Sequence, residues 1–384
     1  MERLIHLLIF PLVIAAVNAV EINLPASTEI LQSIDSVLNE AVNKSKIPGG
    51  VIWLEKEGNK YHKAYGHQSL FPVKKKMTKT SIFDAASLTK VMATAPSIMI
   101  LIEQERIALD DPVRKHLPEF NGGNKNKVTI KQLLTHTSGL RPVLPKKPAW
   151  KGYDKAIKLG ISQKLVELPG KKFRYSDINF ILLGEIVRRV SGKRLDRFSK
   201  EKIFQPLKMV DTNFKPSRSL LPRITPTTRE GNTLIHGIVH DPAARAMGGI
   251  AGHAGLFTSA PDLARFCRMI IGGGKLGNVR ILKKESVALM SRNQTTKLSQ
   301  KVKRGIGWDI DSIYSSPRGE GFPMGESFGH TGWTGGSVWI HPKSKSFLIF
   351  LSNRNHPYER RSIKPLRREL GTLSGKALDL TGHN

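Results

Sequence analysis

The segment Ser87–Lys90 carries a serine hydroxyl and a lysine amine three positions apart. It opens an apolar run that is predicted to be a helix from about Asp84 to Gln104, and residues three apart share a helix face. A serine is a poor nucleophile until a base takes its proton, and a lysine desolvated among apolar neighbours has a lowered pKa that suits this task. N–H groups at the helix start would also stabilise a developing anion. The pair predicts nucleophilic catalysis by Ser87.

The same Ser-x-x-Lys spacing occurs again at Ser199–Lys202, so the spacing alone is weakly specific. Only the first copy opens a run that is apolar nearly all round, as expected of a buried helix. A buried helix holds its first turn at fixed coordinates, which a catalytic pair needs. We therefore assign the chemistry to the first copy.

A tyrosine stands before the other well-marked helix, which is predicted from Asp177 to Val190 and ends before Gly192. Ser176 or Asp177 is expected to cap that helix, which leaves the Tyr175 hydroxyl free to project into a cleft. A tyrosine hydroxyl near a lysine and a serine can relay a proton to a leaving group. Taken alone, a tyrosine that anchors a helix start would be the simpler interpretation.

The glycine-rich segment Phe328–Gly336 lies between two strand-like runs. Glycines in a strand allow close approach by a ligand or by another backbone, and an exposed strand edge can bind an acyl substrate as an added strand. This segment could also donate one N–H group to an oxyanion hole, with the Ser87 N–H as the other donor.

Three motifs follow one another along the chain: Ser-x-x-Lys, then Tyr-Ser-Asp in the place of Tyr-x-Asn, then His-Thr-Gly. This order resembles the serine β-lactamase and penicillin-binding-protein superfamily. The sequence is most similar to the class C-like branch, which includes D,D-peptidases, esterases and relatives of penicillin-binding protein 4. The segments 129–140 and 252–263 also look like that branch, and the resemblance runs from about Thr28 to Arg354.

The resemblance implies a role for each motif residue. Ser87 would be the acylated nucleophile, Lys90 its base and Tyr175 the proton relay. The backbone N–H groups of Ser87 and Trp333 would form the oxyanion hole. The residues expected to bind the substrate are Asp177, His330, Thr331, Gly332 and Trp333.

Two positions depart from the pattern of that superfamily. Asp177 stands where an asparagine is usual, and a carboxylate cannot donate as an amide does. An ion pair with Lys90 is the alternative, and it would raise the lysine pKa and weaken the lysine as a base. His330 replaces the lysine usual in β-lactamases, a change that the resemblance associates with esterases and peptidases. A protonated His330 could recognise a substrate carboxylate, less strongly at neutral pH.

The order of strands and helices predicts one sheet built from both ends of the chain. A hairpin is expected at Val51–Leu54 and Lys60–Tyr65, with helical segments in the middle of the chain. Further short strands are expected at Gly305–Ile310, Glu326–Thr331, Gly336–Ile340 and Phe347–Ser352. This predicts an α/β (α+β) fold with an antiparallel sheet flanked by helices and an inserted, mostly helical domain. The β-lactamase-related domain would span 24–384, with a sheet lobe of about 24–85 and 250–384 and a helical lobe of about 86–249.

The chain has 384 residues and a formal net charge of +30, with 24% charged residues. This composition excludes disorder, collagen and coiled coil. The charge attracts polyanions and makes an anionic envelope polymer one partner to consider, although a solvated basic surface is the simpler interpretation. The lone Cys267 excludes an internal disulfide and any multi-cysteine metal site. A final helix is expected from Tyr358 to Leu370, and its solvated face would carry Arg360, Arg361, Lys364, Arg367 and Arg368.

The first residues are typical of a secretory signal peptide over residues 1–19. Arg3 gives a positive start, an apolar run follows from Leu4 to Val17, and small residues precede a cleavage site after Ala19. A membrane anchor is the alternative, but the run contains Pro11 and falls short of the roughly 20 residues that a spanning helix needs. The mature protein is therefore expected to be periplasmic or secreted, with no transmembrane span and no nucleic-acid partner.

Three histidines and a carboxylate cluster at His236, His240, Asp241 and His253. A metal site would need them to converge, and the glycines and prolines between them argue against this. A loop over the cleft that selects the substrate is the favoured interpretation, so no metal or cofactor is expected. His136 is expected to be structural, holding a turn with Ser138 and Gly139.

Together these features predict an exported serine hydrolase that forms an acyl-enzyme on a peptidoglycan-peptide-like amide or ester, in the manner of a D,D-carboxypeptidase or endopeptidase. A carboxylesterase or a weak class C-like β-lactamase is the alternative within enzymes. An inactive cationic protein that binds an envelope polymer is the alternative from another class.

Overall fold

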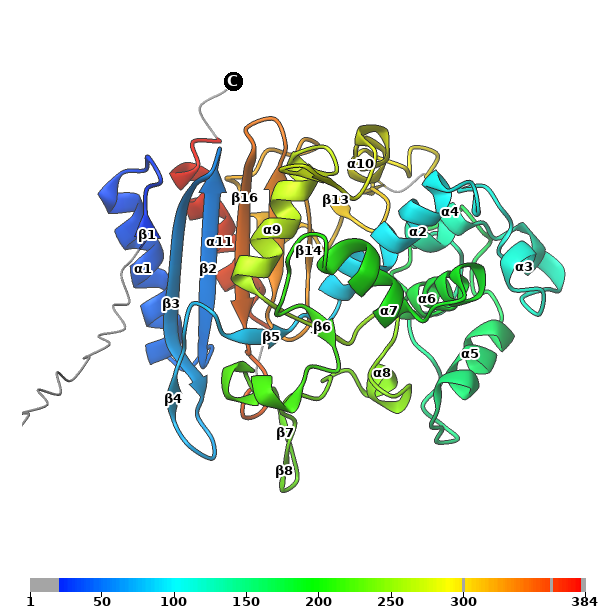
Figure 1. The fold of residues 1–384 in the computed structure, drawn as a ribbon, viewed down its shortest axis with the longest axis horizontal. Helices are drawn as coiled ribbons and strands as arrows, with labels where there is room; N and C mark the ends of the chain where they lie inside the picture. Colours follow the sequence, from blue (N-terminus) through cyan, green and yellow to red (C-terminus); the bar gives the residue numbers. More distant parts are fainter. Residues whose placement is uncertain (1–20, 299–300, 360–361, 381–384) are drawn as a thin grey trace, which may run out of the picture.

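The computed structural model describes residues 21–298, 301–359 and 362–380. Its main feature is a nine-stranded antiparallel sheet in the order β1-β3-β2-β16-β15-β14-β13-β12, with β4 paired to β3 (Figure 1). Strands from the two ends of the chain lie side by side at β2 and β16, which confirms the predicted antiparallel α/β fold. The strands are β1 Glu21–Ile22, β2 Gly49–Lys56, β3 Asn59–Ser69, β4 Lys75–Lys76, β12 Lys303–Arg304, β13 Asp309–Asp311, β14 Phe328–Thr331, β15 Ser337–His341 and β16 Ser346–Ser352.

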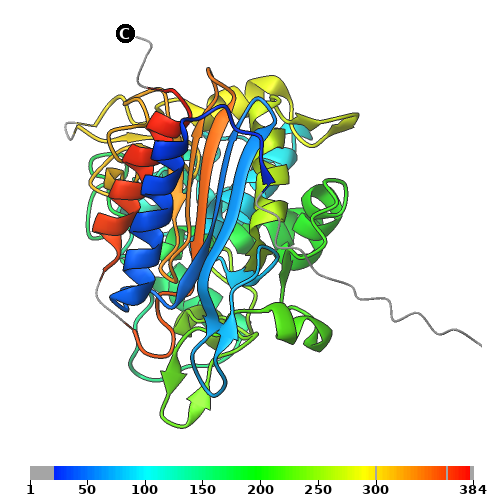
Figure 2. The same ribbon diagram turned by 90° about the vertical axis from the view of Figure 1, so that its left-hand side faces the viewer.

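The central strands are apolar on both faces, because both faces of the sheet are covered. In β2, Val51 and Trp53 belong to the larger hydrophobic core, whereas Ile52 and Leu54 belong to a second core. Helices α1 (Thr28–Asn43) and α11 (Lys364–Ala377) lie side by side over the second core (Figure 2). Helix α9 (Ala260–Ile271) covers the opposite face of β2 and β16 (Figure 1).

The middle of the chain forms the helical part of the molecule. Its best-defined helix is α6, which begins after Ser176 as N-cap and ends at Gly192 in the left-handed conformation. The remaining α-helices are α2 Ala95–Glu103, α3 Val113–His116, α4 Ile130–Leu134, α5 Tyr153–Ser162, α6 Asp177–Ser191, α7 Leu195–Ser199, α8 Pro242–Ala246 and α10 Lys284–Ser291. The other helical turns are the π turns Lys90–Thr94 and Lys200–Phe204 and the 3₁₀ turns Gly123–Lys127, Arg218–Arg223 and Ser316–Arg318.

A second, small sheet lies at the start of the Ser87 helix. It has the order β5-β9-β6, from β5 Ile82–Asp84, β9 Leu256–Ser259 and β6 Asn213–Phe214. Two further hairpins pair β7 Arg229–Glu230 with β8 Thr233–Leu234, and β10 Lys275–Leu276 with β11 Val279–Arg280. Strand β5 thus leads directly from a sheet into the predicted nucleophile.

Two helices differ from their predicted bounds. Asp84 closes strand β5 and is not the first residue of a helix, because Ala86 turns the chain with a φ of 44° before the helix starts. The last helix, predicted from Tyr358 to Leu370, runs from Lys364 to Ala377 and so starts later and continues through Gly371. Gly371 and Gly375 lie directly against the backbone of residues 317–321, and a Cβ atom at either glycine would come within 2.4 Å of it. Close packing therefore explains these glycines.

In the part of the chain that the structure describes, no helix is both long enough and apolar enough to span a membrane. The signal peptide predicted for residues 1–19 lies outside the described residues. The division into two lobes stays a prediction.

Candidate active site

Ser87 stands on a tight turn between strand β5 and the helix that leads into α2. The preceding residue, Ala86, adopts a left-handed conformation (φ 44°), which is costly for a residue with a side chain. The buried Asp84 carboxylate stabilises this turn, because its Oδ1 accepts the Ala86 N–H at 2.8 Å. The turn places Ser87 at the start of a buried helix, as predicted.

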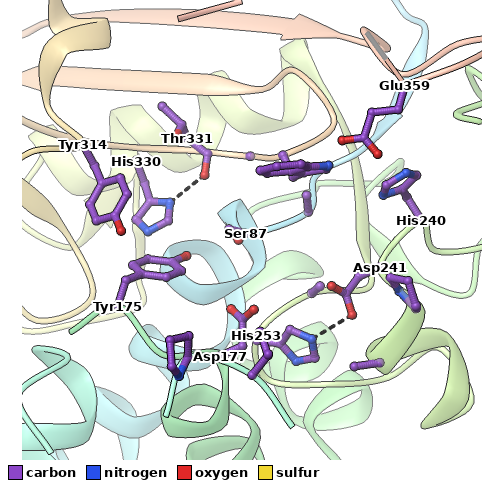
Figure 3. Close-up of a pocket in the computed structure, with 18 of the residues that line it drawn as sticks. Ser87, Tyr175, Asp177, His240, Asp241, His253, Tyr314, His330, Thr331 and Glu359 are labelled. Atoms are coloured by element: carbon purple, nitrogen blue, oxygen red, sulfur yellow. Dashed lines mark hydrogen bonds and ion pairs between the residues drawn. The ribbon is translucent and has the colours of Figure 1, made fainter. Parts of the chain in front are cut away.

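The predicted substrate-contacting residues meet in one cavity of about 1090 Å³ (Figure 3). Residues from four distant segments of the chain line it. They include Ser87, Tyr175, Asp177, His330, Thr331, Gly332 and Trp333. The structure therefore brings these predicted site residues together, with Lys90 buried behind Ser87.

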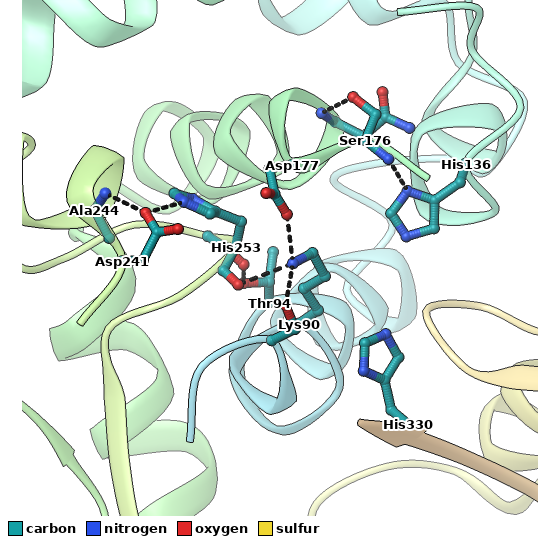
Figure 4. A network of polar contacts seen from close by, with 12 residues as sticks. Lys90, Thr94, His136, Ser176, Asp177, Asp241, Ala244, His253 and His330 are labelled. Carbon is teal, nitrogen blue, oxygen red and sulfur yellow. Dashed lines mark hydrogen bonds and ion pairs between the residues drawn. The ribbon is translucent and has the colours of Figure 1, made fainter. Parts of the chain in front are cut away.

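The Lys90 ammonium is completely enclosed and has an acceptor for each of its protons. Its Nζ lies 3.0 Å from the Ser87 Oγ, 3.0 Å from the His253 carbonyl oxygen and 2.8 Å from Asp177 Oδ1 (Figure 4). An –NH₃⁺ group has three protons and no lone pair, so this arrangement fits the protonated lysine.

The electrostatics of Lys90 differ from the expectation of a simple desolvated lysine. Burial alone would lower its pKa, but the Asp177 carboxylate and the Tyr175 side chain outweigh burial, and the pKa is raised. The lowered pKa expected from apolar neighbours is therefore wrong. The alternative, an ion pair with Asp177, is confirmed.

Tyr175 is held by aromatic stacking on the wall of the cavity. Its ring stacks on His136 at 4.4 Å between centroids and lies 5.5 Å from the ring of Tyr314. The His136 Nδ1 accepts the backbone N–H of Ser176 at 3.1 Å, and burial lowers the pKa of His136 well below its ordinary value. His136 is thus a neutral platform that fixes the Tyr175 segment, a structural role whose partner is Ser176.

His330 is a neutral side chain in this site. Burial, with Arg304 and Lys90 nearby, lowers its pKa well below the ordinary value. The contact of 2.9 Å between its Nδ1 and the Thr331 carbonyl assigns the proton to Nδ1. The buried Nε2 has no hydrogen-bond partner within the described residues and can only accept. The protonated His330 considered for carboxylate recognition is therefore not favoured.

The turn between β14 and β15 lies directly against the Ser87 turn. A Cβ atom on Gly332 would lie 2.6 Å from the Ala85 carbonyl oxygen, so only glycine allows this approach. The Thr334 Oγ1 donates to the Asp84 carbonyl oxygen at 2.7 Å. These contacts join the two segments that were predicted to supply the oxyanion hole.

Two backbone donors remain without an acceptor where these segments meet. Within the described residues, the N–H groups of Ser87 and Trp333 form no hydrogen bond, whereas those of their neighbours Ala86 and Gly332 are paired. Both residues line the cavity. Paired free N–H groups beside a serine hydroxyl are the arrangement that stabilises an oxyanion.

The histidines of the sequence cluster at 236–253 do not all meet at one point. His236 contacts the carbonyl oxygens of residues 221 and 224, and the His240 Nε2 accepts from Asn355. His253 donates from Nε2 to Asp241 Oδ1 at 3.0 Å (Figure 4). His240, Asp241 and His253 do line the cavity (Figure 3), as the loop interpretation predicted.

A different acidic group lies beside Ser87. Ligand atoms of Asp177, Asp241 and His253 all lie within 4.8 Å of one another, a spacing that could hold a cation. The Lys90 ammonium already pairs with Asp177, however, and would repel a second cation. The group is better explained as the counter-charge of Lys90.

Two features of the site were missed from the sequence. The first is Asp84, which the sequence assigned to a helix. Its Oδ2 also accepts the His240 N–H at 2.7 Å, and this bond ties that loop to the Ser87 turn. Arg304 pairs with Asp309 at 3.0 Å in the cavity wall, and no motif marks either residue. For Asp84, its position three residues before Ser87 was the one available signal.

A serine hydroxyl at a buried helix start, bonded to a lysine and facing two free backbone donors, defines a serine hydrolase. The family comparison agrees with this class. The model of the β-lactamase family matches residues 34–372, so the chain belongs to the β-lactamase family.

A named relative and two solved structures are similar to this chain over most of its length. An Escherichia coli K12 protein named as a D-alanyl-D-alanine carboxypeptidase is 29% identical over 369 residues, which cover 86% of this chain and 83% of that protein. A class C β-lactamase structure has a TM-score of 0.73 at 20% identity and covers 93% of this chain and 97% of its own. The hydrolase EstCE1, described as having promiscuous acyltransferase activity, has a TM-score of 0.71 at 21% identity, with 89% and 98% covered. These two structures share the fold.

Proposed function

We propose that this serine hydrolase is an exported D,D-carboxypeptidase or endopeptidase-like enzyme. It would cleave a peptidoglycan-peptide-like amide or ester through an acyl-enzyme on Ser87. The observation that carries the proposal is the Ser87 hydroxyl, 3.0 Å from Lys90 Nζ and beside the free N–H groups of Ser87 and Trp333. The names of the carboxypeptidase relatives support the substrate class. The signal-peptide pattern of residues 1–19 supports export.

Acylation begins with transfer of a proton out of the Lys90 ammonium. The proton passes to solvent against the attraction of Asp177 Oδ1, which lies 2.8 Å away, and a neutral amine is left beside Ser87. The Ser87 Oγ then attacks the substrate carbonyl carbon while Lys90 takes the hydroxyl proton. The tetrahedral oxyanion binds to the N–H groups of Ser87 and Trp333.

Collapse of this intermediate breaks the bond between the carbonyl carbon and the leaving group. Tyr175 relays a proton from Lys90 to the leaving amine or alcohol, and the acyl group stays on Ser87 as an ester. Water then attacks that ester, and the same groups carry its proton back. The free acid leaves, and Ser87 regains its hydrogen.

The open edge of β14 supports binding of an extended acyl chain. Strand β14 pairs with β13 through Gly329 and Asp309, and its neighbours His330 and Thr331 line the cavity beyond that pair. A peptide can add to such an edge as a further strand, with its scissile carbonyl near Ser87. This geometry supports the proposal of an extended peptide substrate.

Labelling of the purified protein tests the proposal. The protein is exposed to a fluorescent penicillin and, separately, to a fluorophosphonate, and the adducts are located by peptide mass spectrometry. A stable penicillin adduct on Ser87, with release of D-alanine from a D-Ala-D-Ala peptide, is the expected result. Fluorophosphonate labelling alone would favour the carboxylesterase or, with nitrocefin turnover, a β-lactamase. No adduct from either probe would overturn the enzyme proposal and favour the polymer-binding alternative.

Ser199→Ala is a matched control for Ser87→Ala. Ser199 occupies the second Ser-x-x-Lys segment, but its hydroxyl donates to the Leu195 carbonyl oxygen at 2.7 Å inside α7. We expect Ser87→Ala to abolish labelling without loss of folding and Ser199→Ala to keep it.

A further inference from the structure

The turn that carries the Trp333 N–H is held through its carbonyl oxygens by Arg367 of helix α11. The Arg367 Nη2 donates to the carbonyl oxygens of Gly332 at 2.6 Å and Gly336 at 2.8 Å. Its Nε lies 3.3 Å from the Gly335 carbonyl oxygen. One guanidinium therefore contacts both ends of the turn.

Arg354, which follows strand β16, contacts the two remaining carbonyls of the same turn. Its Nε donates to the Trp333 carbonyl oxygen at 2.6 Å, and its backbone N–H donates to the Thr334 carbonyl oxygen at 3.0 Å. Every carbonyl oxygen from Gly332 to Gly336 thus accepts a hydrogen bond, whereas the Trp333 N–H donates none within the described residues. The acceptors of the turn are therefore occupied, and its free donor belongs to a residue that lines the cavity.

The contact between Arg367 and Gly332 bears on catalysis through a single peptide group. The Gly332 carbonyl and the Trp333 N–H belong to the same peptide unit, in which electron density is shared between oxygen and nitrogen. A charged donor on the oxygen draws that density away from the nitrogen, so the N–H becomes a stronger donor. This effect passes through the peptide group and does not require contact between Arg367 and the substrate.

We propose that Arg367 is a positioning residue of the oxyanion hole, which aims the Trp333 N–H at the reacting carbonyl and polarises it. The inference rests on the proposed function only in so far as Ser87 is the nucleophile. It does not depend on which amide or ester is the substrate.

The surroundings of Arg367 separate this role from that of an ordinary helix arginine. Within the described residues, Arg367 forms no ion pair with a carboxylate, although its side chain is partly buried. Its neighbour Arg368 is exposed and pairs with Glu320 at 2.7 Å. A partly buried charge without a counter-ion is costly, so its retention favours a role other than stability. The solvated-face prediction for this helix is therefore wrong for Arg367.

Variants at these two neighbouring positions test the inference. Arg367→Ala, Arg367→Lys and Arg368→Ala are compared by the second-order rate constant for fluorophosphonate labelling of Ser87. Loss of a whole oxyanion-hole donor costs about 10²–10³-fold in rate, so a weakened and less fixed donor is expected to cost about 10- to 100-fold. Arg368→Ala is expected to label within about twofold of the unchanged protein. Equal labelling rates in Arg367→Ala and Arg368→Ala would overturn the proposal.

Chemical rescue distinguishes the proposed role from a general loss of structure. Millimolar guanidinium is expected to restore part of the labelling rate of Arg367→Ala, because the ion can occupy the site left by the side chain. Ammonium and urea are expected to restore less, since neither is a planar cation with paired donors. A rate loss that no cation restores, together with a matching fall in the unfolding temperature, would assign Arg367 to stability and refute the proposal.

A spectroscopic measurement tests the polarised N–H without any labelling reagent. The chain has five tryptophans, so ¹⁵N-tryptophan labelling gives few backbone amide signals, and a Trp333→Phe variant assigns the relevant one. The Trp333 amide proton is expected to move upfield in Arg367→Ala while the other tryptophan amides stay in place. An unmoved Trp333 signal would contradict polarisation by Arg367. This measurement remains informative if Ser87 is not the nucleophile, so the two proposals can fail separately.

Discussion

Replacing Asp177 with asparagine restores the amide usual in the superfamily and removes the counter-charge of Lys90. At the 2.8 Å separation of this pair, two unit charges attract by about 6 kcal/mol at an effective dielectric constant of about 20. The Asp177 side chain is 22% exposed, so solvent reduces this figure. Even a fraction of this energy is large enough to move a pH–rate profile, because one pKa unit corresponds to about 1.36 kcal/mol.

The assay is the pH dependence of kcat/KM, or of the fluorophosphonate labelling rate. Because the Asp177 charge raises the Lys90 pKa, the Asn variant has more neutral lysine at any given pH. The acid limb of the profile is expected to move to lower pH, with a higher rate at neutral pH, by about tenfold for each unit moved. An acid limb in the same place in both proteins would refute the assignment of Lys90 as the base. Asp154→Asn, at an exposed acid of helix α5, is the matched control.

Stability gives a second readout of the same pair. A lysine whose folded pKa is raised contributes stability that is present below the unfolded pKa and is lost as pH rises through the folded pKa. Removing one partner of a buried pair costs about 3–5 kcal/mol where the other stays charged. Asp177→Asn is therefore expected to lower the free energy of unfolding most at neutral pH, where both groups are charged, and least at alkaline pH. A deficit that is equal across the pH range would contradict the buried ion pair.

Three further changes test other parts of the site. Asp84→Asn removes an acceptor for the Ala86 or His240 N–H and is expected to cost about 1–3 kcal/mol of stability and at least about tenfold in labelling rate. Burial raises the pKa of Asp84 from 3.8 to about 6, so the contribution of Asp84 to the free energy of unfolding falls by about 3 kcal/mol as pH rises through that interval. Urea unfolding should therefore show a smaller loss of stability in Asp84→Asn at pH 7 than at pH 4. Equal losses at the two pH values would contradict this. His330→Gln keeps an acceptor and is expected to leave the acid limb unmoved, because His330 is neutral throughout the working range; a shifted limb would show that His330 titrates there. Gly332→Ala places a Cβ atom 2.6 Å from the Ala85 carbonyl oxygen and is expected to slow labelling about 100-fold or more. The control is Gly160→Ala, whose Cβ meets a flexible leucine side chain at 3.3 Å and which should leave the labelling rate unchanged.

The sequence predicted those parts of the site that lie close together in the chain or within recognisable motifs. Ser87 stands on the turn that starts the helix, and Lys90 follows three residues later, so local geometry alone brings them together. Tyr175 and Trp333 could be placed near them only through the resemblance, because no local pattern fixes contacts between distant segments. The sheet was predictable for a related reason, since β2 and β16 are strongly apolar strands at opposite ends of the chain.

The parts that sequence reasoning missed depend on long-range contacts of polar residues. The role of Asp84 arises from two backbone donors, at Ala86 and His240, and the second lies 156 positions away. Arg367 was assigned to a solvated face because a run of basic residues on a helix is usually exposed. Its carbonyl partners lie more than 30 positions earlier, and no side-chain type in that turn signals an acceptor. Backbone acceptors leave no trace in the sequence, so such residues are recognised only from the folded chain.

The two departures from the superfamily pattern act on the same group. Asp177 adds a negative charge beside Lys90, and His330 removes the positive charge that a lysine would place nearby. An added negative charge and a lost positive charge both favour the protonated lysine. The resting site is therefore one in which Lys90 is an ammonium held by three acceptors, and the Asp177 charge opposes loss of its proton. Since Asp177 and His330 act through one proton, restoring asparagine and lysine together should not give the sum of the single effects. The pair of departures is thus better understood as a single change in where the resting proton lies than as two independent losses.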